Sequence, residues 1–249
     1  MNNDLQRSLI LCDIVYNDPK YKIIKGNEVK YLQFYIQCNK WKSNNSLNKN
    51  NLFIKKEPYI AYSKINNILY LSISGTIHNK QFFEYLNGIY DKVYEINEFC
   101  EGEYYYHKIF LEYFRRVKNI INDIVSKNLC SKLVISGHSV GGSVAILVAL
   151  ILKLKYPNKK IVFYSFGAPS GCCDKLKLLI NNTISKCINF RTKKDFIPKL
   201  TPKFLFKSPG KILVIDDCEI DNESKDEDFY YYHKTKNYYY LIDKHFRGK

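Results

Sequence analysis

The chain has 249 residues, of which 46% are hydrophobic and 15% aromatic, so it can bury a sizeable core. No run reaches the roughly 18 apolar residues that a membrane-spanning helix needs. The net charge of +15 is most simply a solvated lysine-rich surface. No helix carries clustered basic and aromatic residues, so an anionic lipid surface fits better as a partner than nucleic acid, which we do not expect.

The N-terminal segment lacks the features of a signal peptide. Its apolar stretch of about eight residues is interrupted by Asp13 and has no small-residue cleavage site. The eight cysteines are scattered without a C-x-x-C pair, and Cys172 adjoins Cys173, which suits neither a zinc site nor a disulfide framework. We therefore expect free thiols, no metal site and a cytoplasmic location.

Two strands are expected after an N-terminal helical and strand region and a polar loop at residues 42–51. The segment YIAYSKINNILYLSIS, residues 59–74, predicts two strands joined by a turn at KINN. The second strand runs directly into Gly75 and Thr76.

Two helices are expected before the next strand. Residues 79–99 place six apolar side chains near helical spacing with charges between them, which predicts either an ordinary amphipathic surface helix or a lid. These six are Phe82, Phe83, Leu86, Ile89, Tyr90 and Val93. Residues 110–128 also place apolar side chains at helical spacing, and that helix leads into the next strand.

The segment LVISGHSVGGSVAILVALIL, residues 133–152, changes from a strand into a helix around one serine. Its first residues are typical of a buried strand, and residues 143–155 predict a helix that is apolar on nearly every face. Three glycines let the chain segments approach closely, so Ser139 is pushed outward in the G-x-S-x-G pattern of a nucleophile elbow. The alternative is a turn whose serine only caps the helix; a phosphate-binding loop fits poorly because no Gly-Lys-Ser/Thr follows.

Two further buried strands are expected in KKIVFYSFGAPS, residues 159–170, and KCINFRTKKDFIPKL, residues 186–200. Strands that alternate with helices predict an α/β fold with a mostly parallel sheet and helices on both faces. Ligands of such sheets lie beyond the carboxyl ends of the strands, where Ser139, Gly167 and Asp195 would gather.

A serine nucleophile needs a histidine base and a carboxylate that orients the histidine, and in this architecture the chain order is serine, acid, histidine. Asp195 follows a strand across a short polar loop, where a catalytic acid belongs, although an ordinary turn aspartate fits about as well by position alone. Asp174 opens a predicted helix, and we expect Asp216 and Asp217 to be solvated at the edge of an acidic segment.

Two of the five histidines follow the acid. His233 lies at a predicted junction between a loop and a helix, whereas His245 is close to a terminus that we expect to fray, so His233 is the better candidate. The alternative is that His233 is a surface histidine in an aromatic tail. His138 adjoins the serine and is expected to pack beneath the turn, and His107 precedes the serine and fails the order test.

An oxyanion hole needs N–H donors aimed at the developing negative charge. The residue after the nucleophile, Val140, supplies one N–H. The loop SGTIHN suits the second, because Gly75 permits a close approach and Thr76 offers an N–H and a hydroxyl.

Together these segments resemble the class 3 lipase family, the α/β-hydrolase group that includes the fungal triacylglycerol lipases. The matching stretches span residues 60–242 and are, in order, YLSISGT, YYYHKIF, LVISGHSVGGSVA, FYSFGAPSG, RTKKDFIPKLTP and HKTKNYYYLI. The chain departs from the family pattern at Ser74, where arginine is usual, at Val140, where leucine is usual, and at Ile109, where glycine is usual.

The resemblance implies a role for each matching residue. It implies Ser139 as the nucleophile, Asp195 as the acid and His233 as the base. It implies Thr76 and Val140 as the oxyanion donors, and a structural place near the site for the histidine of YYYHKIF.

The resemblance also implies a single α/β-hydrolase domain over residues 1–249, with a lid at residues 77–104. The segment DDCEIDNESKDED, residues 216–228, holds eight acidic residues and one lysine and is expected to form an acidic surface insert.

These features predict a serine hydrolase that cleaves carboxylic esters of lipids, either acylglycerols or phospholipids, through an acyl-enzyme and without any cofactor. Transient association with an anionic membrane surface is a weaker expectation. The alternative from another class is a lipase-like binding protein that has lost turnover, and a thioesterase or a peptidase would use the same groups.

Overall fold

A central sheet organises the computed structural model, which describes residues 3–16, 60–75, 93–95, 104–218 and 230–247. Six strands lie in the order β1-β2-β5-β6-β7-β8, with β1 antiparallel to β2 and all other neighbours parallel. Their bounds are β1 Ile60–Ile65, β2 Ile68–Ile73, β5 Lys132–His138, β6 Lys160–Phe166, β7 Lys186–Thr192 and β8 Lys211–Ile215. The predicted α/β class with a mostly parallel sheet is confirmed.

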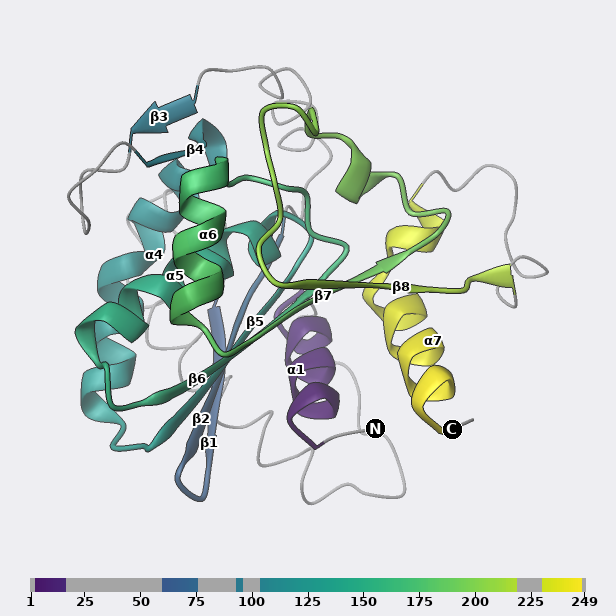
Figure 1. The fold of residues 1–249 in the computed structure, drawn as a ribbon. Coiled ribbons are helices and arrows are strands. Elements are labelled where there is room, and N and C mark those ends of the chain that lie inside the picture. Colours follow the sequence, from purple (N-terminus) through teal and green to yellow (C-terminus); the bar gives the residue numbers. More distant parts are fainter. Residues whose placement is uncertain (1–2, 17–59, 76–92, 96–103, 219–229, 248–249) are drawn as a thin grey trace, which may run out of the picture.

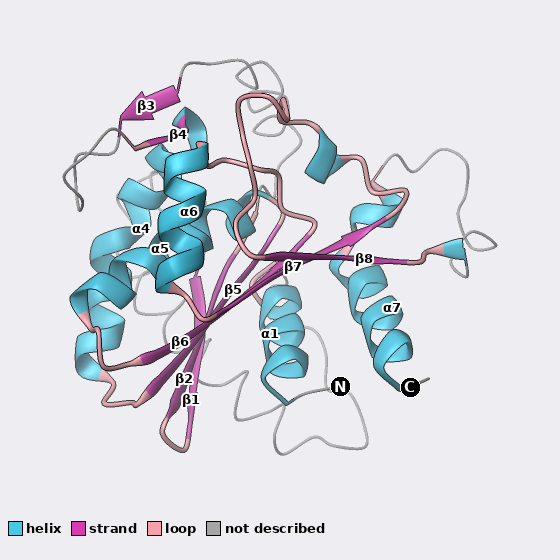
Figure 2. Cartoon of the chain, viewed as in Figure 1, coloured by secondary structure: helices cyan, strands magenta, loops and turns pink. Residues whose placement is uncertain are grey.

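Helices cover both faces of this sheet, as Figures 1 and 2 show. One face carries α4, α5 and α6, and the opposite face carries α1 and α7. Their bounds are α1 Asn3–Ile14, α4 Lys108–Lys127, α5 Val140–Lys155, α6 Asp174–Thr183 and α7 Thr235–Arg247. Among the described residues, no helix is both long enough and apolar enough to cross a membrane.

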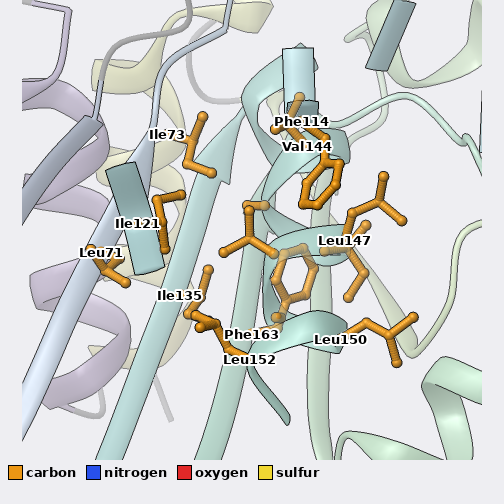
Figure 3. Close-up of a cluster of buried hydrophobic side chains, with 14 of the residues drawn as sticks. Leu71, Ile73, Phe114, Ile121, Ile135, Val144, Leu147, Leu150, Leu152 and Phe163 are labelled. Carbon is orange, nitrogen blue, oxygen red and sulfur yellow. The ribbon is translucent and has the colours of Figure 1, made fainter. Parts of the chain in front are cut away.

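The alternation of side chains along the strands builds two separate cores. On β5, Leu133 and Ile135 belong to the core beneath α4 and α5, whereas Val134 between them belongs to the core beneath α1 and α7. This follows from the period of two residues in a strand, which sends successive side chains to opposite faces. Figure 3 shows the first core, where side chains of α5 meet those of β5 and β6.

Helix α5 is apolar on almost every side because it is covered on almost every side. It packs against β5, β6 and α4, and Leu147 and Leu150 are fully buried within it. Helix α4, by contrast, presents one apolar stripe to this core, as the spacing of its residues predicts. The two helices position the turn at the start of α5 firmly against the sheet.

A buried polar cluster attaches α1 to the opposite face. The buried carboxylate of Asp4 forms an ion pair with Lys132 at the start of β5. The Tyr70 hydroxyl donates to Asp4 Oδ1 over 3.0 Å, and Arg7 donates to the Tyr70 oxygen over 2.8 Å. These contacts fix the end of α1 that lies at the amino ends of the parallel strands.

Three local expectations are wrong. Val93 belongs to strand β3, Val93–Glu95, which pairs with β4, Tyr105–His107, so the helix expected over residues 79–99 does not include it. Asp217 is fully buried, because its Oδ2 accepts the backbone N–H of Lys194 over 2.7 Å. His245 lies within α7, because the apolar face of that helix is packed against the sheet and keeps the terminal turns helical.

Two expected features lie largely outside the described residues. Of the lid expected at residues 77–104, the structure describes β3 and residue 104. Of the acidic insert expected at residues 216–228, it describes residues 216–218. Asp216 there is exposed and pairs with Lys193 over 2.7 Å.

Candidate active site

A sharp turn joins β5 to α5 and holds Ser139. Its backbone has φ 56° and ψ −138°, a left-handed conformation that is costly for a residue with a side chain and that recurs at functional turns. Ser139 occupies the N-cap position of α5, yet its side chain makes no capping hydrogen bond. The alternative interpretation, a serine that only caps the helix, is therefore wrong.

Glycine is required where α5 crosses the end of β2. A Cβ on Gly141 would lie 2.2 Å from the carbonyl oxygen of Ile73 and 2.4 Å from that of Ser74. Such contacts are far closer than any van der Waals separation, so only glycine fits. The absent side chain lets the start of the helix lie directly on the strand before the expected oxyanion loop.

The loop after β7 buries the carboxylate of Asp195. Its Oδ1 accepts the backbone N–H of Ile197 over 2.9 Å, at the start of a short 3-10 helix, η1 (Ile197–Lys199). Its Oδ2 accepts from His233 Nδ1 over 2.8 Å and from the Tyr238 hydroxyl over 2.6 Å. A buried carboxylate is tolerable because three donors compensate for its lost hydration.

His233 ends a second 3-10 helix, η3 (Tyr231–His233), immediately before α7. Because a carboxylate only accepts hydrogen bonds, the neutral imidazole donates from Nδ1 and carries its lone pair on Nε2. Nε2 is buried and has no hydrogen-bond partner among the described residues. This is the protonation and orientation that a general base needs.

The serine and the Asp195–His233 pair meet at the end of β6. Ser139 donates its backbone N–H to the carbonyl of Phe166 over 2.9 Å. The next residue, Gly167, has φ +62°, and a Cβ there would lie 2.8 Å from Asp195 Oδ2 and 2.9 Å from the His233 ring. The carboxyl end of β6 therefore contacts all three predicted residues.

A chain of hydrogen bonds runs behind the turn through His138. Its Nε2 lies 2.6 Å from the carbonyl oxygen of His233, which can only accept, so Nε2 carries the proton. Its Nδ1 then accepts from the Tyr16 hydroxyl over 2.8 Å, and the Tyr16 oxygen accepts the N–H of Gly75 over 2.7 Å. Burial, and secondarily the nearby His233, hold the pKa of His138 well below its ordinary value, so it stays neutral.

The expected oxyanion donors are described in part. Val140 is the first residue of α5, so its N–H is one of those at a helix start that lack a partner within the helix. Gly75 lies against the turn, because a Cβ there would lie 2.7 Å from Ser139 Cβ. Thr76 follows Gly75 in the sequence and lies outside the described residues.

Two tyrosines at the site were not predicted from the sequence. Tyr16 is contributed by the turn after α1, and nothing in its local sequence distinguishes it from the other tyrosines of this tyrosine-rich chain. Tyr238 lies on the buried side of α7 and reaches Asp195 from there, a contact that depends on how the helix packs against the sheet. His107 is fully buried and stacks on Phe110 with ring centroids 4.3 Å apart. Within the described part of the chain, no cluster of His, Cys, Asp and Glu side chains could hold a metal ion.

The chain matches known proteins in fold and in family. The fold is similar to that of the Rhizomucor miehei triacylglyceride lipase, with 17% identity and a TM-score of 0.57 over 80% of this chain and 84% of that one. MDLA from Penicillium cyclopium, solved as a variant, aligns with 18% identity and a TM-score of 0.60 over 87% of this chain and 82% of that one.

Coverage is lower for another neighbour. A deletion variant of the R. miehei lipase in complex with its propeptide aligns at 20% identity with a TM-score of 0.56. The alignment covers 65% of this chain, and this chain spans only about half, 52%, of that one. No curated protein sequence matches the chain.

The model of the family Lipase (class 3) matches residues 70–205, more than half of the chain. The chain belongs to the class 3 lipase family, and the resemblance noted in the sequence is confirmed.

Proposed function

We propose that the protein hydrolyses carboxylic esters of lipids by acyl transfer to Ser139. His233 Nε2 takes the proton of the Ser139 hydroxyl as the oxygen attacks the ester carbonyl, and Asp195 stabilises the resulting imidazolium. The N–H groups of Val140 and Thr76 donate hydrogen bonds to the carbonyl oxygen as it becomes negatively charged. The alcohol then leaves with the proton from His233, and the acyl group remains on the serine.

The second half of the reaction repeats these steps with water. His233 Nε2 deprotonates a water molecule, which attacks the acyl-enzyme, and the tetrahedral intermediate collapses to release the fatty acid and regenerate the Ser139 hydroxyl. The residues named supply every proton transfer, so the proposal invokes no cofactor.

One observation carries this proposal: a strained serine turn and a buried Asp195–His233 pair meet at the same strand end, with His233 Nε2 unpaired among the described residues. His138, by contrast, uses both of its ring nitrogens in hydrogen bonds. The family supports lipid esters as the substrate class, and acylglycerols and phospholipids are the two candidate groups.

The test is hydrolysis of a soluble short-chain ester and of a long-chain acylglycerol emulsion by the purified protein and by Ser139→Ala. The proposal predicts turnover of both substrates and a loss of at least about 10³-fold in the variant. Ser143→Ala is the matched control, because the Ser143 hydroxyl is committed to the carbonyl of Pro169 over 2.7 Å. No turnover by the folded wild-type protein would instead favour a lipase-like binding protein.

A further inference from the structure

A loop with an exposed aromatic tip lies between η1 and β8. Figure 1 shows this segment of chain arching over the molecule between β7 and β8. Within it, Phe204 is 78% exposed and Leu205 is 40% exposed, whereas the next residue, Phe206, is buried. Residues 201–207, TPKFLFK, are called the apolar-tip loop below.

Both ends of the apolar-tip loop are fixed to the body of the protein. At its start, the Thr201 hydroxyl accepts the N–H of Ser170 over 3.0 Å. At its end, Lys207 and Cys172 exchange backbone hydrogen bonds of 2.7 and 3.1 Å. Phe206 packs its ring 5.1 Å from that of His107. The exposure of Phe204 is therefore a consequence of how the loop is held, since its flanking residues are anchored.

The loop lies at the same edge of the sheet as the candidate active site. Ser170 and Cys172, which hold it, follow β6 and Gly167, and Gly167 contacts Asp195 and His233. The loop and the site therefore share this edge of the sheet.

The surroundings of the tip are strongly basic. Residues 193–211 hold six lysines and one acidic residue, Asp195, which is buried. Lys203 directly precedes Phe204, Lys199 lies in η1 just before the loop, and both are exposed. Lysines alone would indicate only a solvated surface, and an exposed phenylalanine alone is ordinary. An exposed aromatic side chain flanked by lysines is complementary to an anionic lipid surface, which has negatively charged head groups above an apolar layer of acyl chains.

We propose that the apolar-tip loop is the site at which the protein docks onto an anionic lipid surface. Phe204 and Leu205 enter the boundary between head groups and acyl chains, and Lys199 and Lys203 contact the negative head groups. The docking deepens the proposed function and rests on it, because it brings the serine turn to the surface that holds lipid esters.

The test is flotation with vesicles of phosphatidylserine and phosphatidylcholine, and with vesicles of phosphatidylcholine alone. The test variant is Lys203→Gln with Phe204→Ser. The matched control is Lys127→Gln with Leu129→Ser, at the opposite edge of the sheet, where Leu129 is 82% exposed and precedes β5. Both variants lose one positive charge and one exposed apolar side chain.

The wild-type protein is expected to float with phosphatidylserine vesicles and to bind phosphatidylcholine vesicles more weakly. The test variant is expected to lose about tenfold or more in partitioning, whereas the control stays within about twofold of wild type. Equal binding by the two variants, or no wild-type binding, would overturn the proposal.

A second measurement separates this proposal from the proposed function. The rate at which a soluble fluorophosphonate labels Ser139 is expected to be the same in the test variant and in wild type, because Lys203 and Phe204 are exposed whereas Ser139, Asp195 and His233 are buried. If the wild-type protein floats with the vesicles but is not labelled, the proposed hydrolase function is wrong and the docking proposal stands. If Ser139 is labelled but the test and control variants float equally, the docking proposal is wrong and the hydrolase function stands.

Discussion

One oxygen of the Asp195 carboxylate accepts hydrogen bonds from two side chains, His233 Nδ1 and the Tyr238 hydroxyl. Burial, and then the Asp195 charge, hold the pKa of Tyr238 well above its ordinary value, so its hydroxyl stays a donor throughout the working range of pH. The bond to Tyr238 therefore restrains the carboxylate in the orientation that faces His233.

Tyr238→Phe removes this donor and leaves the ring in place. Because the lost bond is buried and its acceptor is charged, we expect the free energy of unfolding to fall by about 2 kcal/mol. We expect kcat to fall roughly tenfold with KM nearly unchanged, since the carboxylate is less well oriented. Urea titration and initial rates on a soluble ester measure the two effects. Unchanged kcat would mean that Tyr238 has only a structural role.

His138 makes stability depend on pH in a defined direction. Burial lowers its pKa well below 6.5 in the folded protein, so between the two pKa values the unfolded state binds the proton and the folded state does not. This contribution to stability is complete above about pH 6.5 and is lost as the pH falls toward the folded pKa, by up to about 1.4 kcal/mol per pH unit. The groups that face its ring are Tyr16, His233 and Tyr238.

His138→Gln should therefore flatten the dependence of unfolding free energy on pH below about pH 6.5, whatever its effect on the absolute stability. Urea titrations at a series of pH values give this slope for both proteins. A variant slope as steep as that of wild type would show that His138 does not resist protonation in the folded state.

The turn between β5 and α5 is the element on which the site depends, and its glycines are not equivalent. A Cβ on Gly141 would meet rigid backbone atoms of β2, whereas a Cβ on Gly142 would meet the Cβ atoms of Ala168 and Ser165 at 2.7 and 2.9 Å. We expect Gly141→Ala to cost about 3 kcal/mol or more, and Gly142→Ala to cost less, because the nearest atom would lie 2.2 Å from the new Cβ at Gly141 and 2.7 Å from it at Gly142. Thermal unfolding of the two variants ranks them, and the reverse order would contradict this account of the turn.

At the scale of elements, local patterns predicted the fold well. The strand, turn and helix around Ser139 were evident because period and glycine placement are local properties, and the same holds for α4 and for the hairpin of β1 and β2. Strand β3 was mistaken for helix because an apolar residue at helical spacing fits either structure when the segment is short. The burial of Asp217 depends on the Lys194 backbone, far from it in sequence, and no local pattern encodes that contact.

At the scale of the whole molecule, the hydroxyl of Tyr16 joins the turn after the N-terminal helix to the site. Tyr16 bridges Gly75, at the end of β2, and His138, whose other nitrogen holds the backbone of His233. These contacts join residues that are 59, 95 and 122 positions apart in the chain, so no local pattern points to Tyr16, whereas Ser139, Asp195 and His233 could be proposed from local motifs and chain order. Candidate residues that are recognised by chain order and by their place at strand ends can be proposed from the sequence. Residues that reach the site through the packing of distant helices cannot.

Tyr16→Phe leaves the Gly75 N–H and His138 Nδ1 without this partner. We expect the rate of ester hydrolysis to fall roughly tenfold through kcat, because the strand end before Thr76 and the histidine behind the turn both lose a restraint. Tyr240→Phe is the control, since Tyr240 is half exposed on α7. Equal rates for the two variants would show that Tyr16 does not position the site.

The most direct measurement of the central claim is labelling by a fluorophosphonate, followed by peptide mapping, on the wild-type protein, Ser139→Ala and His233→Ala, with detergent present. An activated serine predicts one adduct, on Ser139, which is absent from Ser139→Ala and forms far more slowly in His233→Ala. The absence of any adduct in the folded wild-type protein, or an adduct on another residue, would contradict the assignment of Ser139 as a nucleophile activated by His233 and Asp195.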